Sequence, residues 1–193
     1  MNKRILVVDD DRVFRLIVNK ILTSTKHDFE ITEAANAEEC LDILKEQTFD
    51  AILLDFELGE TNGIQMINAI LARQHQYTPI IMISAHNDDE RMYSSLQHGA
   101  QDYLVKDEVD RRNLLRSIRY AEERSEIMRK MEQLANFDSL TGLANRASFL
   151  NRLNKICETT ETSATLFFID IDDFKPINDT FGHEAGDLSL IHI

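Results

Sequence analysis

Short apolar runs alternate with amphipathic stretches over the first 120 residues of the chain. Five of these runs predict β-strands: Ile5–Val8, Phe29–Thr32, Ala51–Leu54, Pro79–Ile83 and Tyr103–Val105. The stretches between them repeat apolar residues every three or four positions, which indicates helices at about 12–23, 37–46, 63–73 and 88–97. Strands and helices that alternate at this pitch predict an α/β domain, with a five-stranded, doubly wound parallel sheet and helices on both faces.

One long helical segment follows, from Asp110 to about Phe137, and contains no proline or glycine that would end it. Its first half carries apolar residues that we expect to pack on the sheet: Leu114, Leu115 and Ile118. Its second half carries apolar residues spaced by four and three, with one more beside them: Ile127, Met131, Leu134 and Met128. This is about two heptads of a coiled-coil-like seam. An ordinary amphipathic connecting helix and a dimerising signalling helix both fit the pattern.

The pattern changes again beyond the long helix. Gly142 interrupts the helix, and a new one is expected to begin near Asn145. After it, the apolar run Ala164–Ile169 predicts a buried strand that ends at Asp170. This helix and strand indicate a second module after the long helix.

Composition narrows the class of protein. A length of 193 residues allows one full domain and part of another. The net charge of −13 excludes the basic footprint of a nucleic-acid-binding protein. The apolar runs are far shorter than the roughly 20 residues that span a bilayer, and the start of the chain lacks a signal peptide. Cys40 and Cys157 have no companions at metal-ligand spacing. We expect a cytoplasmic protein with neither nucleic-acid nor membrane partners.

Polar residues stand at the ends of four predicted strands: Asp9 and Asp10, then Asp55, Ser84 and Lys106. Ligands of such sheets bind outside the carboxyl ends of the strands, so these side chains are expected at one edge. Three converging carboxylates repel one another and favour a hard divalent cation such as Mg2+. One carboxylate can then attack a phosphoryl group, while the ammonium and the hydroxyl stabilise the phosphoryl oxygens.

In order and context, these residues resemble the receiver domains of two-component response regulators over about residues 1–120. The resemblance implies a flavodoxin-like fold, and it makes Asp55, within Leu-Leu-Asp-Phe-Glu-Leu-Gly-Glu-Thr-Asn-Gly, the phosphoacceptor. It implies Mg2+ held by the following groups: Asp9, Asp10, Asp55 and the backbone carbonyl of Glu57. It implies three further roles: Ser84 as switch hydroxyl, Tyr103 as switch aromatic and Lys106 as phosphate-binding lysine. A histidine kinase or phosphotransfer protein is then the phosphoryl donor.

Two positions depart from the family pattern. Asp107 follows Lys106, where the family usually has a proline after a cis bond. A cis bond before a non-proline residue costs about 2.5–4 kcal/mol, so we expect this turn to be built differently. Glu57 places an additional acid two residues after the phosphoacceptor, and we expect it to alter the lifetime of the phosphoaspartate.

Two later motifs resemble the front half of GGDEF diguanylate cyclase domains: Asp138-Ser-Leu-Thr-Gly-Leu-Ala-Asn-Arg146 and the block from Asp170 to Asp187. An Asp-x-Asp pair alone is a weak signal, but the extended pattern is specific. The resemblance implies metal binding by Asp170 and the Ile171 carbonyl. It implies nucleotide binding by four residues: Phe174 and Lys175 near the phosphates, and Asn178 and Asp187 at the guanine. It leaves His183 a structural role.

The name-giving Gly-Gly-Asp-Glu-Phe run does not occur in the sequence. The resemblance implies an incomplete α+β domain in this part of the chain. We therefore expect three parts: a receiver at 1–120, a linker helix at 121–135 and an N-terminal GGDEF fragment at 136–193. The fragment is expected to be inactive, because condensing two GTP molecules needs two complete domains face to face. The last six residues match one reading frame of a common transposon-derived sequencing adapter, and we expect them to be foreign to the gene.

Three functions from different classes remain open. The first is a response regulator whose phosphorylation controls synthesis of cyclic di-GMP from GTP, acting as a homodimer through the receiver and linker helix. The second is a stand-alone receiver that serves as a phosphate sink or interaction module. The third is an unrelated metal-dependent phosphatase built on the Asp-x-Asp pair. We favour the first for the parent protein, while the second can describe the chain as given.

Overall fold

The computed structural model describes residues 2–24, 29–72, 77–158 and 165–191. The chain divides into two compact units, Met1–Arg129 and Lys130–Ile193. None of the helices in these described ranges combines the length and the apolar composition that crossing a membrane requires.

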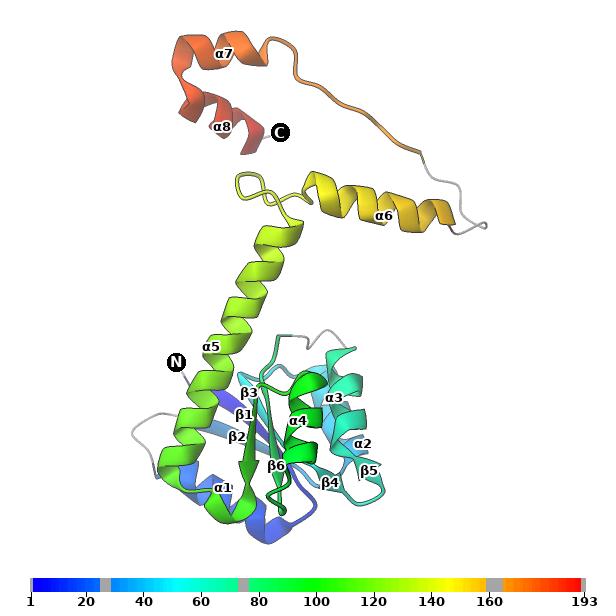
Figure 1. Cartoon of the computed structure of the whole chain (residues 1–193). Helices are drawn as coiled ribbons and strands as arrows, with labels where there is room; N and C mark the ends of the chain where they lie inside the picture. Colours follow the sequence, from blue (N-terminus) through cyan, green and yellow to red (C-terminus); the bar gives the residue numbers. More distant parts are fainter. Residues whose placement is uncertain (1, 25–28, 73–76, 159–164, 192–193) are drawn as a thin grey trace. The chain divides into compact units, whose positions relative to one another are not determined.

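The first unit is built on a five-stranded sheet with the strand order β2-β1-β3-β6-β7 (Figure 1). Its strands are β1 (Lys3–Val8), β2 (Phe29–Ala34), β3 (Ala51–Asp55), β6 (Ile80–Ser84) and β7 (Asp102–Val105). All neighbouring pairs of these strands are parallel. The predicted doubly wound sheet is thus confirmed, and each of the five runs predicted for it overlaps an observed strand. A short antiparallel hairpin of β4 (Glu57–Leu58) and β5 (Thr61–Asn62) follows β3.

The helices between the strands also agree with the prediction. They are α1 (Arg12–Thr23), α2 (Ala37–Glu46), α3 (Gly63–Leu71) and α4 (Asp89–Gln97). Each begins after an Asp or Asn whose side chain accepts a hydrogen bond from a backbone N–H of the first turn: Asp11, Asn36, Asn62 and Asp88. Such caps satisfy N–H groups that have no partner inside the helix, which is why the helices begin there.

Two hydrophobic cores cover the two faces of the sheet, because successive side chains of a strand point to opposite sides. One core joins the sheet to α2 and α3 through residues that include Leu6, Ile52, Cys40 and Ile67. The other joins it to α1 and α5 through residues that include Val7, Leu53, Val18 and Ile118. Helices on both faces explain why the central strands read as nearly continuous apolar runs.

The first half of the long helix α5 (Arg111–Asn136) packs on the sheet. The predicted packing of its first half is confirmed, since Leu114 and Ile118 are buried and Leu115 is partly buried. Polar contacts then fasten the helix: Lys3 Nζ lies 2.6 Å from a carboxylate oxygen of Glu122, and the Ser125 hydroxyl donates to the Tyr77 carbonyl. Beyond them, the four apolar residues of the predicted seam are exposed.

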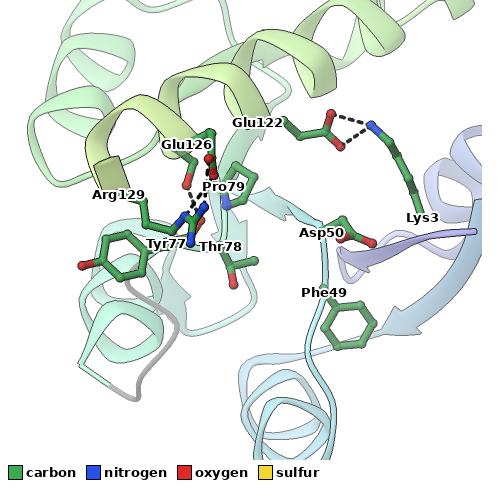
Figure 2. A pocket seen from close by; sticks show the side chains of 10 residues that line it. Lys3, Phe49, Asp50, Tyr77, Thr78, Pro79, Glu122, Glu126 and Arg129 are labelled. Carbon is green, nitrogen blue, oxygen red and sulfur yellow. Dashed lines mark hydrogen bonds and ion pairs between the residues drawn. The ribbon is translucent and has the colours of Figure 1, made fainter. Parts of the chain in front are cut away.

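An open pocket of about 470 Å³ lies at the amino edge of the sheet, beside α5 (Figure 2). Figure 2 shows the Glu122 carboxylate directed at Lys3 and the Arg129 guanidinium beside Glu126. The residues that line the pocket include Lys3 at the start of β1 and Pro79 just before β6. None of the predicted site residues lines this pocket, so it is a junction between α5 and the sheet rather than part of the predicted site.

The second unit holds three described helices besides the end of α5. They are α6 (Arg146–Glu158), α7 (Phe174–Phe181) and α8 (His183–Ile191). The predicted interruption around Gly142 and the new helix near Asn145 are confirmed. Between α5 and α6, one carboxylate oxygen of Asp138 accepts hydrogen bonds from the backbone of Leu140 and Thr141, and Gly142 has a φ of 70°. A positive φ is readily adopted only by glycine, which explains this residue in the turn.

The predicted buried strand Ala164–Ile169 is wrong. Ala164 lies outside the described residues, and residues 165–169 form neither strand nor helix. Their apolar side chains are exposed, with Phe168 at 95%. A strand is stabilised by backbone hydrogen bonds to a neighbour, and the described part of the second unit contains no other strand that could pair with this run.

Candidate functional site

Three carboxylates meet at the carboxyl edge of the sheet. Asp9 follows β1 directly, Asp10 comes next, and Asp55 is the last residue of β3. Because β1 and β3 are parallel neighbours, with Val8 opposite Leu54, the two strands end side by side. Each carboxylate offers an oxygen atom, and these atoms lie within 4.8 Å of one another. Asp9 and Asp55 are almost fully buried, whereas Asp10 is exposed.

Lys106 brings a positive charge to the buried pair. It follows β7 and begins a short 3-10 helix, η1 (Lys106–Glu108). Its Nζ lies 2.7 Å from Oδ2 of Asp9 and 2.9 Å from Oδ2 of Asp55. The same ammonium lies 4.9 Å from the centre of the Phe14 ring, which supplies a cation–π contact. The ammonium therefore bridges two carboxylates that would otherwise repel each other at close range.

Burial and charge shift the protonation equilibria of this cluster. Burial, together with the negative charge of Asp9, raises the pKa of the Asp55 carboxyl from 3.8 to about 6, although Lys106 opposes the shift. Burial by itself would lower the pKa of Lys106, but the hydrogen bonds to Asp9 and Asp55 outweigh it and the pKa is raised. Lys106 is therefore a permanent cation at neutral pH, and Asp55 is a carboxylate held in an unfavourable environment.

Ser84 and Tyr103 contact the loop that follows β6. Ser84 ends β6 and is buried, and its Oγ accepts a hydrogen bond of 3.2 Å from the backbone N–H of His86. Tyr103 lies on β7, and its hydroxyl donates to the carbonyl of His86 at 2.9 Å. Both residues therefore stand on strands that end at this edge, and both hold the same loop.

The turn after Lys106 differs from the usual family pattern, as the presence of Asp107 in place of proline predicts. No peptide bond among the described residues is cis, and η1 continues the chain with trans bonds. The ammonium of Lys106 reaches the carboxylates from this helical turn.

Arg91, which no sequence motif pointed to, stands beside the site. Its Nη1 lies 2.6 Å from a carboxylate oxygen of Glu57, and its Cζ lies 4.9 Å from the centre of the Phe56 ring. This hydrogen bond lowers the pKa of the Glu57 carboxyl. The backbone N–H of Glu57 also donates to Oδ1 of Asp55 at 3.4 Å. Residues 34 positions apart meet here, so periodicity and motif spacing carried no signal for the contact.

Gly63 is a second residue that motif reasoning did not single out. Its backbone N–H donates to the carbonyl of Phe56 at 2.8 Å, which folds the segment after β3 back on itself. A Cβ at this position would lie 2.9 Å from the carbonyl oxygen of Asp55. Only glycine leaves the backbone beside Asp55 undisturbed.

The donor set at this edge fits a hard divalent cation. Carboxylate and carbonyl oxygens are the ligands that Mg2+ prefers in proteins, and the cluster supplies three carboxylates from two neighbouring strand ends. The candidate holders are the side chains of Asp9, Asp10 and Asp55 and the carbonyl of Glu57. A cation there would reduce the repulsion among the carboxylates, which Lys106 alone now compensates.

The predicted nucleotide residues of the second unit are only partly assembled. Asn178 on α7 packs against Gly186 on α8, so close that a Cβ on Gly186 would collide with the Asn178 amide oxygen. Asp187 follows Gly186, and the two residues predicted to read guanine therefore come near each other. Asp170 is exposed, and in the described part of this unit no hydrogen bond or ion pair joins it to them. Ile171, Phe174 and Lys175 lie at and before the start of α7.

Two known protein families match this chain. The model of the response regulator receiver domain matches residues 5–119, which is more than half of the chain. The chain belongs to the response regulator receiver family. The model of the GGDEF domain, diguanylate cyclase, matches residues 135–193. The protein is thus a response regulator receiver followed by GGDEF sequence.

Individual relatives agree with the receiver assignment. The transcriptional regulatory protein SrrA of Staphylococcus aureus is 36% identical over 116 residues, which cover 60% of this chain and 46% of that protein. The chain thus matches about half the length of this curated relative. A receiver domain from Methanospirillum hungatei JF-1 has a TM-score of 0.57 at 29% identity, over 66% of this chain and 99% of that structure.

A third likeness concerns the fold alone. The N-terminal domain of a response regulator/sensory box/GGDEF protein from Carboxydothermus hydrogenoformans has a TM-score of 0.57 at 24% identity. It covers 65% of this chain and 98% of that structure. Both structural matches span roughly the length of the first unit.

Proposed function

We propose that Asp55 accepts a phosphoryl group from a histidine kinase or a phosphotransfer protein in a Mg2+-dependent reaction. One observation carries the proposal: the Asp55 carboxylate is buried, lies 2.9 Å from an ammonium, and shares its site with two further carboxylates. A buried acid that is costly to leave charged and has a cation beside it is suited to accept an electrophilic group.

Each residue of the site has its own role in the phosphoryl transfer. An oxygen of Asp55 attacks phosphorus, the bond from phosphorus to the donor breaks, and the donor keeps the electron pair of that bond. Mg2+, which the carboxylates of Asp9, Asp10 and Asp55 and the Glu57 carbonyl would hold, would neutralise charge on the phosphoryl oxygens. Lys106 donates to a phosphoryl oxygen. Ser84 Oγ accepts from His86, so its own O–H is available to donate to another.

The surface beside the site is suited to a protein donor. The helix α1 begins two residues after Asp10, and three of its apolar residues are exposed on one face: Val13, Leu16 and Ile17. Their i, i+3, i+4 spacing forms a single apolar stripe at the rim of the carboxylate cluster. An apolar helix face of this kind packs well against a helix of a partner.

We assign the output by the same reasoning from family sequence. Residues 1–120 form the receiver, residues 121–135 the linker helix and residues 136–193 part of a GGDEF domain. We propose that phosphorylation of Asp55 controls a cyclase that makes cyclic di-GMP from GTP in the cytoplasm. A homodimer through the receiver and the exposed seam of α5 brings two cyclase domains together. We expect residues 1–193 alone to make no cyclic di-GMP, because the Gly-Gly-Asp-Glu-Phe run does not occur among them.

A second candidate function has one observation in its favour. The first unit has two complete cores of its own, which cover both faces of the sheet. Such a unit can accept phosphoryl groups without any output, as a phosphate sink or an interaction module.

The test is incubation with Mg2+ and acetyl phosphate, followed by intact mass measurement of the wild type and of Asp55→Asn. We expect one phosphoryl adduct on the wild type, dependent on Mg2+, and none on the variant. Absence of an adduct on the wild type, or an equal adduct on Asp55→Asn, contradicts the proposal. Addition of GTP to the same sample tests the output, and formation of cyclic di-GMP would overturn our view of the second unit.

A further inference from the structure

The segment directly after the phosphoacceptor is tied to α4 by one arginine. Arg91 stands in the first turn of α4, and its guanidinium reaches Glu57 of β4 at 2.6 Å. Glu57 is two residues from Asp55, and its backbone N–H already contacts the Asp55 carboxylate. The ion pair therefore connects the segment next to the carboxylate cluster with α4.

The two partners of this ion pair are not equally restrained. The Arg91 side chain is 30% exposed, and it is held by the Phe56 ring and by Asp88, whose carboxylate lies 3.4 Å from Nε. The Glu57 side chain is 58% exposed, and among the described residues its carboxylate accepts a hydrogen bond from Arg91 alone. Arg91 is thus the fixed member, and the direction of the Glu57 carboxylate depends on it.

We propose that Arg91 is a positioning residue of the phosphorylation site, which holds the Glu57 carboxylate against α4 and keeps its charge away from an incoming anionic phosphoryl donor. This inference rests on the proposed phosphoacceptor role of Asp55. No sequence motif assigns a role to Arg91, and the contact exists only because α4 packs beside the β4 segment.

The physical consequence is electrostatic. A phosphoryl donor such as acetyl phosphate is an anion, and the acceptor already shares its site with two other carboxylates. A fourth carboxylate that is free to turn toward the opening repels the donor and slows its approach. A carboxylate paired with a guanidinium presents almost no net charge at that point.

The experiment compares four proteins: the wild type, Arg91→Ala, Glu57→Gln and the double variant. Each full chain is phosphorylated with acetyl phosphate and Mg2+, and the initial rate is followed by intact mass. We expect Arg91→Ala to slow phosphorylation by at least about threefold, since a free carboxylate then faces the donor. The double variant should return to within about twofold of the wild type, because no carboxylate is left to be positioned. The deficit of Arg91→Ala should also shrink in 1 M NaCl, where the screening length is about 3 Å.

The outcomes separate this inference from the proposed function. A wild type that gains no phosphoryl group contradicts the role of Asp55 itself. A wild type that is phosphorylated, with a double variant as slow as Arg91→Ala, gives Arg91 a merely structural role and overturns the inference. Equal rates for the wild type and Arg91→Ala overturn it as well. Thermal unfolding of all four proteins verifies that each variant is folded.

Discussion

The ammonium of Lys106 lies 2.9 Å from the carboxylate of Asp55, although the two residues are 51 positions apart in the chain. The contact arises because β3 and β7 lie in one parallel sheet and end at the same edge. The same ammonium lies 2.7 Å from Asp9, so one positive charge serves two buried acids. This arrangement makes the stability of the receiver sensitive to the charge of each of the three residues.

Replacement of Lys106 by methionine should destabilise the metal-free protein. Without the ammonium, two nearly buried carboxylates face each other without compensation, at a cost of about 3 kcal/mol in the free energy of unfolding. Urea unfolding measures this loss, and saturating Mg2+ should restore part of it by taking the place of the missing charge. Lys45→Met is the matched control, because Lys45 is exposed on α2 and its pair with Asp42 contributes less than about 1 kcal/mol. Equal stabilities for the two variants would contradict the bridging role of Lys106.

The Asp55→Asn variant should be more stable than the wild type near neutral pH in the absence of divalent cations. The folded state raises the pKa of Asp55 from 3.8 to about 6, so the native protein binds this proton more tightly than the unfolded chain. The resulting penalty grows as the pH rises from about 4 to about 6 and is complete above that range, where it amounts to about 2–3 kcal/mol. Urea unfolding of both proteins at several pH values should show the difference narrowing toward about pH 4. A difference that does not change with pH would contradict the assigned cause.

Glu57→Asn should change the lifetime of the phosphoaspartate. The amide removes a negative charge two residues from the phosphoryl dianion, so the phosphorylated state suffers less repulsion and we expect hydrolysis to slow by at least about twofold. Loss of the adduct after removal of the donor, followed by intact mass, measures the rate. Glu60→Asn is the control, since Glu60 is exposed in the turn between β4 and β5. Equal dephosphorylation rates for the wild type and Glu57→Asn refute the prediction.

A charge in the exposed seam of α5 should weaken a homodimer without destabilising the monomer. Leu134 is 72% exposed, so Leu134→Glu should change the free energy of unfolding by less than about 0.5 kcal/mol. In a coiled-coil seam, however, the same substitution buries a charge, and the dimer should dissociate in analytical ultracentrifugation of the phosphorylated protein. Gln133→Glu adds the same charge outside the seam and should leave the dimer intact. A dimer that survives Leu134→Glu rules out this seam as its interface.

The exposed run Leu166–Ile169 should make the chain as given prone to association. Phe167 and Phe168 are 79% and 95% exposed, in a segment of high β-propensity that pairs with no strand among the described residues. Replacement of both by serine should lower binding of an apolar dye and raise solubility, with unchanged phosphorylation of Asp55. Dye fluorescence and light scattering measure the effect. If dye binding stays at the wild-type level, the exposed surface lies elsewhere.

Much of the receiver could be predicted from the sequence because its signals are local. Runs such as Ala51–Leu54 are buried on both faces, and the helices between them have one apolar stripe and a capping Asp or Asn. Ligands bind at the carboxyl ends of parallel strands, and this rule predicted that Asp9, Asp55 and Lys106 lie at one edge of the sheet. The same local pattern failed at residues 164–169, since an apolar run becomes a strand only where another strand pairs with it.

The sequence by itself determined the order of strands and helices, the carboxylate cluster and the family, because these depend on periodicity and on residues at strand ends. Only the tertiary structure decided how the negative charges of the cluster are compensated. It set the distance from Lys106 to the two acids and the burial that raises the pKa of Asp55, and it placed Arg91 over Phe56 with its guanidinium on Glu57. These features arise where distant segments pack together, and the electrostatic energy of such a contact depends on separations and burial that only the folded chain sets.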